Sequence, residues 1–201
     1  MKLDTQFTRK LEGVRYVFLD RDGVINRKAA EGDYVSDWAD FQLLPGVEEA
    51  IARLNRHGCR VIVVSNQRGI ALGLYTASAV ETLHDRLQQH LATHGAHVDA
   101  FYYCPHDRGK CQCRKPGIAL FKQAQECFPE VDPATCVVIG DSLSDIEAAR
   151  AFGCQAIFIR GDEATRKGGA DRAEALADAV VESLVEAVAV LSLSARPGEA
   201  R

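Results

Sequence analysis

Residues 14–26 read VRYVFLDRDGVIN, and this stretch decides the fold. Val14–Leu19 is a short, mostly apolar and β-branched run, which is typical of a strand buried on both faces of a parallel sheet. Two carboxylates, Asp20 and Asp22, follow the run without a break, and Gly23 after them favours a turn. We therefore expect a central strand whose carboxyl end carries acidic side chains.

Four further runs of this kind are spread along the chain: Arg60–Val64, Ala100–Tyr103, Cys136–Ile139 and Ala156–Ile159. Helical patterns lie between them, and one with i, i+3, i+4, i+7 spacing is formed by Val47, Ala50, Ile51 and Leu54. A last helix is predicted over Arg172–Leu191. Because strands that alternate with helices form βαβ units, the expected fold is α/β: an open, doubly wound, Rossmann-like parallel sheet of about five strands without a large cap domain.

The composition indicates one domain spanning residues 1–201, with a frayed tail at 192–201. Apolar residues make up 47% and charged residues 26% of the chain, which excludes a disordered or fibrous protein. The net charge of −4 argues against nucleic acid as a partner, and no apolar run is long enough to span a membrane. Because no export signal is visible either, we expect a cytoplasmic monomer.

Polar residues follow four of the predicted strands, at the edge where ligands bind in open parallel sheets. In chain order they are Asp20 and Asp22, Ser65 and Asn66, Arg114 and Lys115, and Asp141 with Asp145. Several carboxylates in one cleft repel one another unless a cation joins them, and Mg²⁺ prefers such oxygen ligands. A calcium-binding loop starting at Asp20 is excluded, because its sixth position would be Ile25 instead of glycine. The sequence thus predicts a magnesium site, with Ser65 and Lys115 holding phosphoryl oxygens.

The order of these motifs resembles the haloacid dehalogenase (HAD) superfamily of phosphotransferases over about Val14–Ile159. An Asp with a second Asp two residues later is followed by a Ser, a Lys and a further Asp. The resemblance implies a phosphatase in which Asp20 is the nucleophile and forms an aspartyl-phosphate. It implies that Asp22 protonates the leaving oxygen and then activates water.

The resemblance also assigns the remaining polar residues at the strand ends. Ser65 would bind phosphate, and Lys115 would neutralise charge on the nucleophile and on the phosphoryl group. Asp141 would bind Mg²⁺ together with Asp20 and the backbone carbonyl of Asp22. Asp145 is expected to contact a water molecule or the lysine.

Four metal-ligating side chains gather between residues 104 and 113: Cys104, His106, Cys111 and Cys113. Three cysteines and one histidine suffice for a closed, tetrahedral Zn²⁺ site, so we expect a structural zinc loop here. The loop matters for catalysis because Arg114 and Lys115 follow its last ligand directly.

The motifs CPH and CQCRKP resemble a zinc-loop subgroup of HAD enzymes that contains heptose bisphosphate phosphatases and histidinol-phosphate phosphatases. DRDGVIN, GDYV, SNQRGIALG and YYCPH are more similar to the heptose enzymes. The expected substrate is a small phosphorylated sugar, D-glycero-D-manno-heptose 1,7-bisphosphate, cleaved at C7, with Asn66 and Arg114 binding it. One alternative is histidinol phosphate, whose ammonium would favour Glu31 or Asp33. A second alternative is a non-enzymatic phosphoacceptor domain of a signalling protein.

Two further groups of side chains have more than one interpretation. His90 and His94 are one helical turn apart, a spacing that also suits metal binding, but we interpret them as an exposed polar face. Trp38, with Tyr34 and Phe41, could line a substrate pocket or anchor a loop, and the sequence leaves both interpretations open.

Overall fold

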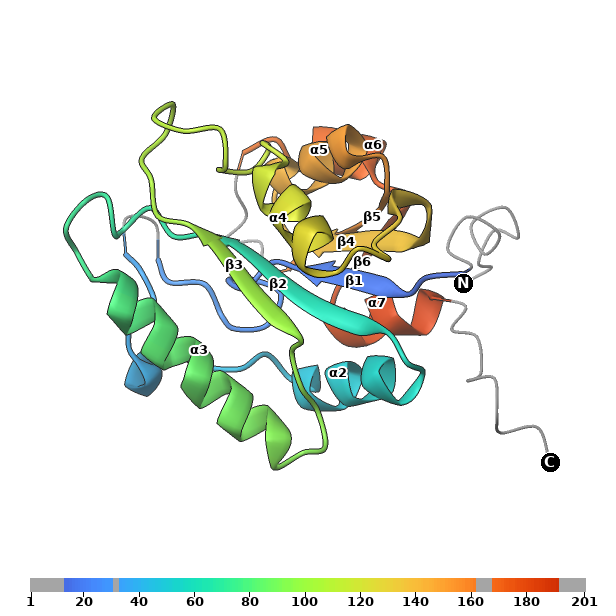
Figure 1. Cartoon of the computed structure of the whole chain (residues 1–201), viewed down its shortest axis with the longest axis horizontal. Coiled ribbons are helices and arrows are strands. Elements are labelled where there is room, and N and C mark those ends of the chain that lie inside the picture. Colours follow the sequence, from blue (N-terminus) through green and yellow to red (C-terminus); the bar gives the residue numbers. More distant parts are fainter. Residues whose placement is uncertain (1–12, 31–32, 162–167, 192–201) are drawn as a thin grey trace.

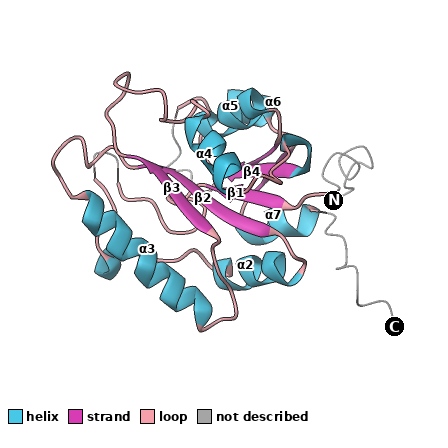
Figure 2. Cartoon of the chain, viewed as in Figure 1, coloured by secondary structure: helices cyan, strands magenta, loops and turns pink. Residues whose placement is uncertain are grey.

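The computed structural model describes residues 13–30, 33–161 and 168–191 (Figure 1). Glu31 and the predicted tail at 192–201 lie outside the described residues. One parallel sheet of six strands, in the order β3-β2-β1-β4-β5-β6, runs through the molecule (Figure 2). The strands are β1 (Tyr16–Leu19), β2 (Arg60–Asn66), β3 (Ala100–Cys104), β4 (Cys136–Gly140), β5 (Gln155–Ile159) and β6 (Ala179–Val181).

Helices cover both faces of the sheet, as Figure 1 shows. They are α2 (Val47–Arg56), α3 (Ala77–Ala92), α4 (Ala119–Cys127), α5 (Leu143–Phe152), α6 (Ala170–Leu176) and α7 (Leu184–Val190). Two short 3-10 helices, η1 (Trp38–Asp40) and η2 (Pro133–Thr135), complete the elements. The doubly wound α/β fold predicted from the sequence is confirmed.

Successive side chains of β1 pack into two different hydrophobic cores, one on each face of the sheet. Val17 and Leu19 pack into the core under α2, α3 and α7, whereas Phe18 packs into the core under α4, α5 and α6. All three side chains are fully buried. Because successive side chains of a strand point to opposite faces, a continuous apolar run is required here, and the sequence supplies it.

The prediction of a single last helix over Arg172–Leu191 is wrong. The segment instead forms α6, the strand β6 and α7, so the sheet gains a sixth strand beside β5. Asp178 explains the break, because its carboxylate accepts a hydrogen bond from the backbone amide of Ala156 at 3.0 Å and pairs with Arg150 at 2.9 Å. Ser183 then starts α7 by accepting a hydrogen bond from the amide of Glu186.

No helix in the described part of the chain is both long and apolar enough to cross a membrane.

Candidate active site

The sheet order places the carboxyl ends of β2, β1 and β4 next to one another. Leu19, the last residue of β1, is in register with Val63 of β2 and with Ile139 of β4. Asp20 therefore emerges between the end of β2, which carries Ser65, and the end of β4, which leads to Asp141. The structure thus brings together three of the predicted site residues from distant parts of the sequence.

Lys115 is the centre of this cluster, and its side chain is only 2% exposed. Its Nζ lies 3.0 Å from Oδ1 of Asp20 and 2.6 Å from Oδ1 of Asp145. It also donates a hydrogen bond of 2.5 Å to the carbonyl oxygen of Val64. Burial acts to lower the pKa of Lys115, but the charges of Asp145 and Asp20 outweigh it and raise that pKa above its ordinary value. The side chain is therefore a fixed positive charge beside Asp20.

Asp141 carries the strongest sign of a cation site. Its Oδ1 is buried without a hydrogen-bond partner among the described residues, and its Oδ2 forms an ion pair with Nζ of Lys28. Burial raises the pKa of Asp141 to about 7, because the charges of Asp20 and Asp145 add to it and outweigh the opposing effect of Lys28. Carboxylate oxygens of Asp20, Asp141 and Asp145 lie within 4.8 Å of one another. This donor set of hard oxygens fits Mg²⁺.

Gly23 is required where the loop after β1 passes Asp141. Its φ is +95°, and a Cβ at this position would overlap the Asp141 carboxylate and the Lys28 side chain. Glycine avoids both the strain of a positive φ and this overlap.

Asp145 lies in the first turn of α5 and contacts Lys115. Its Oδ2 accepts hydrogen bonds from the backbone amide of Ser142 at 3.0 Å and from the Ser142 hydroxyl at 2.5 Å. These bonds fix the carboxylate in a capping box, leaving Oδ1 directed at Lys115. Of the two contacts considered for Asp145, the structure shows the one with the lysine.

Asp22 is held by three neighbouring side chains. Arg21 reaches both of its carboxylate oxygens at 3.0 Å, while Asn26 and Gln67 donate at 2.9 Å and 3.2 Å. Its side chain is 28% exposed, against 11% for that of Asp20. Asp22 is therefore the carboxylate that a ligand entering from solvent reaches most easily.

Gln67 is a functional candidate that the sequence analysis missed. It is buried and donates both to the Ser65 hydroxyl, at 2.5 Å, and to Asp22, while Tyr75 donates to its carbonyl oxygen at 2.8 Å. Because Ser65 accepts from Gln67, the Ser65 hydroxyl keeps its own proton for an anionic ligand. The only sequence signal for Gln67 was its place in the motif SNQ, directly after Ser65 and Asn66.

Asn66 and Arg114 were predicted to bind substrate, and the structure gives them different surroundings. The Asn66 amide accepts from the backbone N–H of Lys115 at 3.0 Å and donates to its carbonyl at 3.2 Å, so Asn66 holds Lys115 in place. Nη1 of Arg114 is buried and has no hydrogen-bond partner within the described part of the chain. This guanidinium nitrogen therefore keeps hydrogen-bond donor capacity that no described residue uses.

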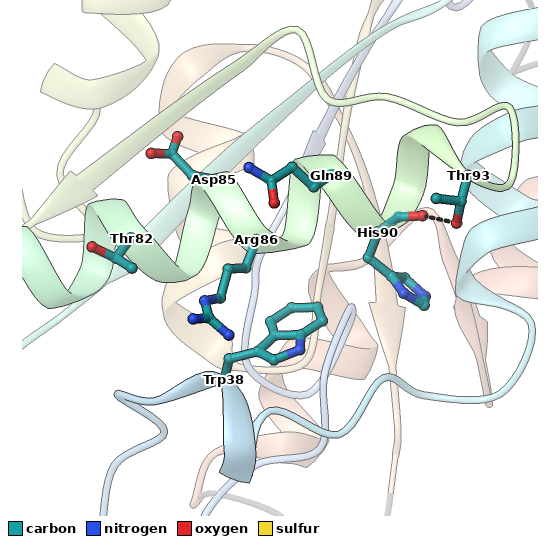
Figure 3. Close-up of a pocket in the computed structure, with 7 residues that line it drawn as sticks. All are labelled: Trp38, Thr82, Asp85, Arg86, Gln89, His90 and Thr93. Carbon is teal, nitrogen blue, oxygen red and sulfur yellow. Dashed lines mark hydrogen bonds between the residues drawn. The ribbon is translucent and has the colours of Figure 1, made fainter.

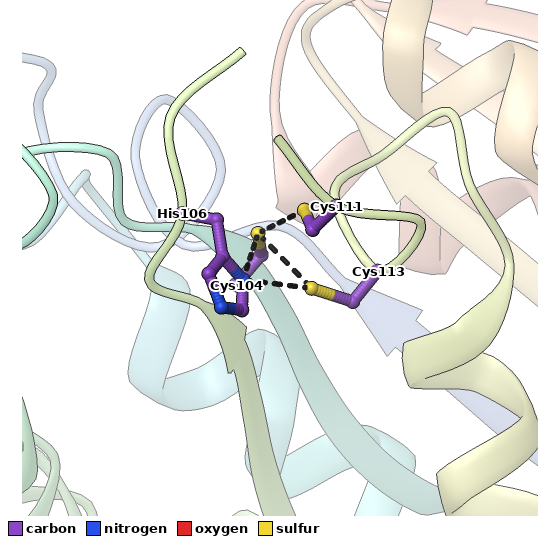
Figure 4. Close-up of side chains that lie close together, drawn as sticks. All are labelled: Cys104, His106, Cys111 and Cys113. Carbon is purple, nitrogen blue, oxygen red and sulfur yellow. Dashed lines mark hydrogen bonds between the residues drawn. The ribbon is translucent and has the colours of Figure 1, made fainter. Parts of the chain in front are cut away.

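The four predicted zinc ligands lie together at the end of β3 (Figure 4). Sγ of Cys104 is 3.5 Å from Sγ of Cys111 and 3.3 Å from Sγ of Cys113, and Nδ1 of His106 is 3.3 Å from Sγ of Cys113. Ligand atoms around a tetrahedral zinc ion are about 3.5–3.8 Å apart. Burial acts to raise the pKa of Cys111, but hydrogen bonds from the Arg114 amide and the neighbouring thiols lower it to about 6, which favours a thiolate. The cluster therefore fits Zn²⁺.

Trp38 anchors the segment after β1 against α3. Its ring stacks on Phe41 with centroids 5.3 Å apart and packs against the core under α2 and α3. It also lines a cavity of about 590 Å³ along α3 (Figure 3), which contains none of the predicted catalytic residues. Tyr34 instead lines a separate cavity of about 380 Å³, together with Arg27, Lys28 and Asp33.

Comparison of the chain with known proteins shows which family it belongs to. A family model described as HAD-hydrolase-like matches residues 112–187. The D-glycero-alpha-D-manno-heptose-1,7-bisphosphate 7-phosphatase of Mycobacterium bovis is 42% identical over 181 residues, covering 87% of this chain and 90% of the relative. The chain belongs to the HAD-like phosphatases. As a member of this family it is a phosphoric monoester hydrolase, so the predicted enzyme class is confirmed and the alternative of a non-enzymatic phosphoacceptor is wrong.

Other relatives of this HAD-like phosphatase carry similar names. The D-glycero-beta-D-manno-heptose-1,7-bisphosphate 7-phosphatase of Pseudomonas aeruginosa is 40% identical, over 76% of this chain and 85% of the relative. The crystal structure of D,D-heptose 1,7-bisphosphate phosphatase from B. bronchiseptica, complexed with magnesium and phosphate, superimposes with a TM-score of 0.75. The two proteins share 31% identity over 88% of this chain and 97% of the other.

Proposed function

We propose that this HAD-like phosphatase removes the C7 phosphate of D-glycero-D-manno-heptose 1,7-bisphosphate through an aspartyl-phosphate on Asp20. The observation that carries the proposal is the contact of Lys115 with Asp20, beside the acidic cluster of Asp141 and Asp145 at the carboxyl ends of the strands. The names of the relatives support the choice of substrate, because two of them, at 42% and 40% identity, are heptose-1,7-bisphosphate 7-phosphatases.

In the first step a carboxylate oxygen of Asp20 attacks the phosphorus atom, and the bond between phosphorus and the C7 oxygen breaks. Lys115 holds the attacking group in place and offsets the negative charge that gathers around the phosphoryl oxygens. The Ser65 hydroxyl, with its proton left available by Gln67, donates to one of those oxygens.

Asp22 supplies the proton that the departing C7 oxygen needs. It then takes a proton from the water molecule that attacks the aspartyl-phosphate, which releases inorganic phosphate and restores Asp20. Its partial exposure suits both transfers, whereas Asp145 is fully buried against Lys115 and suits neither.

Magnesium is the proposed cofactor, held by carboxylate oxygens of Asp20 and Asp141 and by the backbone carbonyl of Asp22. When bound, it would neutralise charge on the transferred phosphoryl group and orient it toward Asp20. The unpartnered, buried Oδ1 of Asp141 is the observation that supports a cation here.

Arg114 favours a bisphosphate over histidinol phosphate. The cavity beside Tyr34 is lined by Arg27, Lys28, Asp33 and Asp40, whose opposite charges balance and do not select either substrate. Arg114 directly precedes Lys115 in the sequence and adds a guanidinium with unused donor capacity, which suits the second phosphate of a bisphosphate. The test is phosphate release from both anomers of the heptose bisphosphate and from histidinol phosphate. The proposal predicts the highest kcat/KM for a heptose bisphosphate, and a preference for histidinol phosphate would contradict it.

Arg114→Ala is expected to lower kcat/KM for the heptose bisphosphate by roughly 10–1,000-fold, the loss expected for one or two charged hydrogen bonds. The same change should affect a heptose 7-phosphate much less, because that substrate lacks the distal group. Arg108→Ala removes an exposed arginine of the same loop and serves as the matched control. An equal loss of kcat/KM on both substrates would contradict a contact between Arg114 and the distal phosphate.

We also propose that Cys104, His106, Cys111 and Cys113 bind one structural Zn²⁺. We expect about one zinc per chain by elemental analysis, present in addition to Mg²⁺. Cys113→Ser should lower both the zinc content and Tm, and should reduce activity by loosening Lys115 two residues away. Cys127→Ser, which changes an exposed cysteine of α4, should leave all three unchanged. Protein purified without chelators and free of zinc would contradict the proposal.

A further inference from the structure

A third group of metal-ligating side chains lies at the ends of α2 and α3, apart from the acidic cluster and the zinc loop. Glu48 is in the first turn of α2, His90 is in the last turn of α3, and His94 follows that helix. One ligand atom from each residue lies within 4.8 Å of the other two, so one ion could reach all three. From the sequence, the two histidines were interpreted as an exposed polar face. The third ligand, Glu48, is distant in the sequence, and only the fold brings it next to them.

The hydrogen bonds of His94 prepare this ring for metal binding. Its Nδ1 lies 3.1 Å from the carbonyl oxygen of His90, and because a carbonyl can only accept, Nδ1 carries the hydrogen. In the neutral ring the lone pair is therefore on Nε2. Metal-binding histidines in proteins commonly donate their other N–H to a carbonyl or carboxylate in this way.

His90 and Glu48 are already in contact. Nε2 of His90 lies 3.1 Å from Oε1 of Glu48, and since the carboxylate accepts, a proton lies between the two groups. A divalent cation can take the place of that hydrogen and keep both groups as ligands when the hydrogen of the neutral His90 ring moves from Nε2 to Nδ1. Negative ends of backbone dipoles at the carboxyl end of α3, which spans Ala77–Ala92, also favour a cation here.

We propose that Glu48, His90 and His94 bind one borderline divalent transition-metal ion, of the class of Zn²⁺ or Ni²⁺, and so link α2 to α3. Two imidazole nitrogens and one carboxylate oxygen suit this class of ion and suit Mg²⁺ poorly. The site is separate from the acidic cluster at Asp141 and from the zinc loop. It does not depend on the proposed substrate.

Trp38 provides a spectroscopic reporter for this site. It is the single tryptophan of the chain, and its ring centroid lies 5.9 Å from that of His90. Figure 3 shows the indole facing the His90 end of α3. A paramagnetic ion such as Ni²⁺ bound to His90 should therefore quench most of the tryptophan fluorescence.

The experiment titrates Ni²⁺ into tag-free enzyme that carries only the one zinc ion of the zinc loop, in the presence of Mg²⁺, and follows the fluorescence of Trp38. We expect saturable quenching with one site per chain and a rise in Tm, because the ion binds the folded state. Glu48→Gln and His94→Gln should each raise the Kd at least tenfold and abolish the rise in Tm. His97→Gln, which changes a half-exposed histidine of the same loop, should leave both signals unchanged.

Quenching that does not saturate would overturn the proposal. So would an equal Kd in the wild type and in both ligand variants, since the ion would then bind elsewhere. A variant that fails to fold is recognised before the titration by its loss of helical signal in circular dichroism. In that case Glu48→Asp, which keeps the carboxylate but shortens its reach, should weaken Ni²⁺ binding, and an unchanged Kd would contradict the role of Glu48.

Discussion

Asp20→Asn is expected to lower kcat by roughly 10³–10⁶-fold, the range seen when a covalent nucleophile is removed. An amide oxygen is a poor nucleophile and a weaker ligand for Mg²⁺ than a carboxylate oxygen. The fold should survive, because the substitution keeps the size of the side chain and Lys115 retains its ion pair with Asp145. The measurement is phosphate release from the heptose bisphosphate.

The control for this variant is Asp85→Asn, which makes the same chemical change on an exposed residue of α3. Circular dichroism should give the same spectrum for the wild type and both variants. Mass spectrometry is needed to exclude deamidation of the introduced asparagine back to aspartate. If Asp20→Asn that has not deamidated turns over near the wild-type rate, Asp20 is not the nucleophile.

Lys115→Met should reduce kcat by about 10²–10³-fold and lower the free energy of unfolding by about 3–5 kcal/mol. The activity falls because the positive charge beside Asp20 is lost. The stability falls because Asp20 and Asp145 are left as buried carboxylates without their common partner. The measurements are steady-state kinetics and denaturant unfolding, with the exposed Lys110→Met as the control in the neighbouring loop.

A double variant separates the two effects of Lys115. Adding Asp145→Asn to Lys115→Met removes one of the uncompensated charges, so a large part of the stability should return while activity stays low. Recovery of both together would show that Lys115 acts only by holding the fold, and would contradict its proposed role at the phosphoryl group.

Motifs at the ends of buried strands were the part of the site that sequence could predict. Asp20, Ser65 and Asp141 are far apart in the chain, yet parallel strands bring their carboxyl ends to one edge of the sheet. The cluster of three cysteines and His106 was predictable for a different reason, because Cys104 and Cys113 are close in sequence and one loop can close around them.

Side-chain partners were not predictable, because they depend on how a loop turns after its strand. Arg21 lies between the two acidic residues of the first motif, and only the fold shows that it is buried against Asp22 and donates to the Val35 carbonyl. The last helix was mispredicted because the apolar spacing ran on through Ala179–Val181. The contacts of Asp178 that break the helix come from other elements.

The most direct test of the central claim is to identify the residue that becomes phosphorylated during turnover. Wild-type enzyme and Asp22→Asn are mixed with the heptose bisphosphate and Mg²⁺, quenched, and treated with borohydride, which reduces an aspartyl-phosphate to homoserine. Peptide mass spectrometry should find homoserine at position 20 only when substrate is present, and more of it in Asp22→Asn, where hydrolysis of the intermediate is slowed. Phosphate release by the wild type with no homoserine at position 20 in either protein, or with the modification at another residue, would contradict the account.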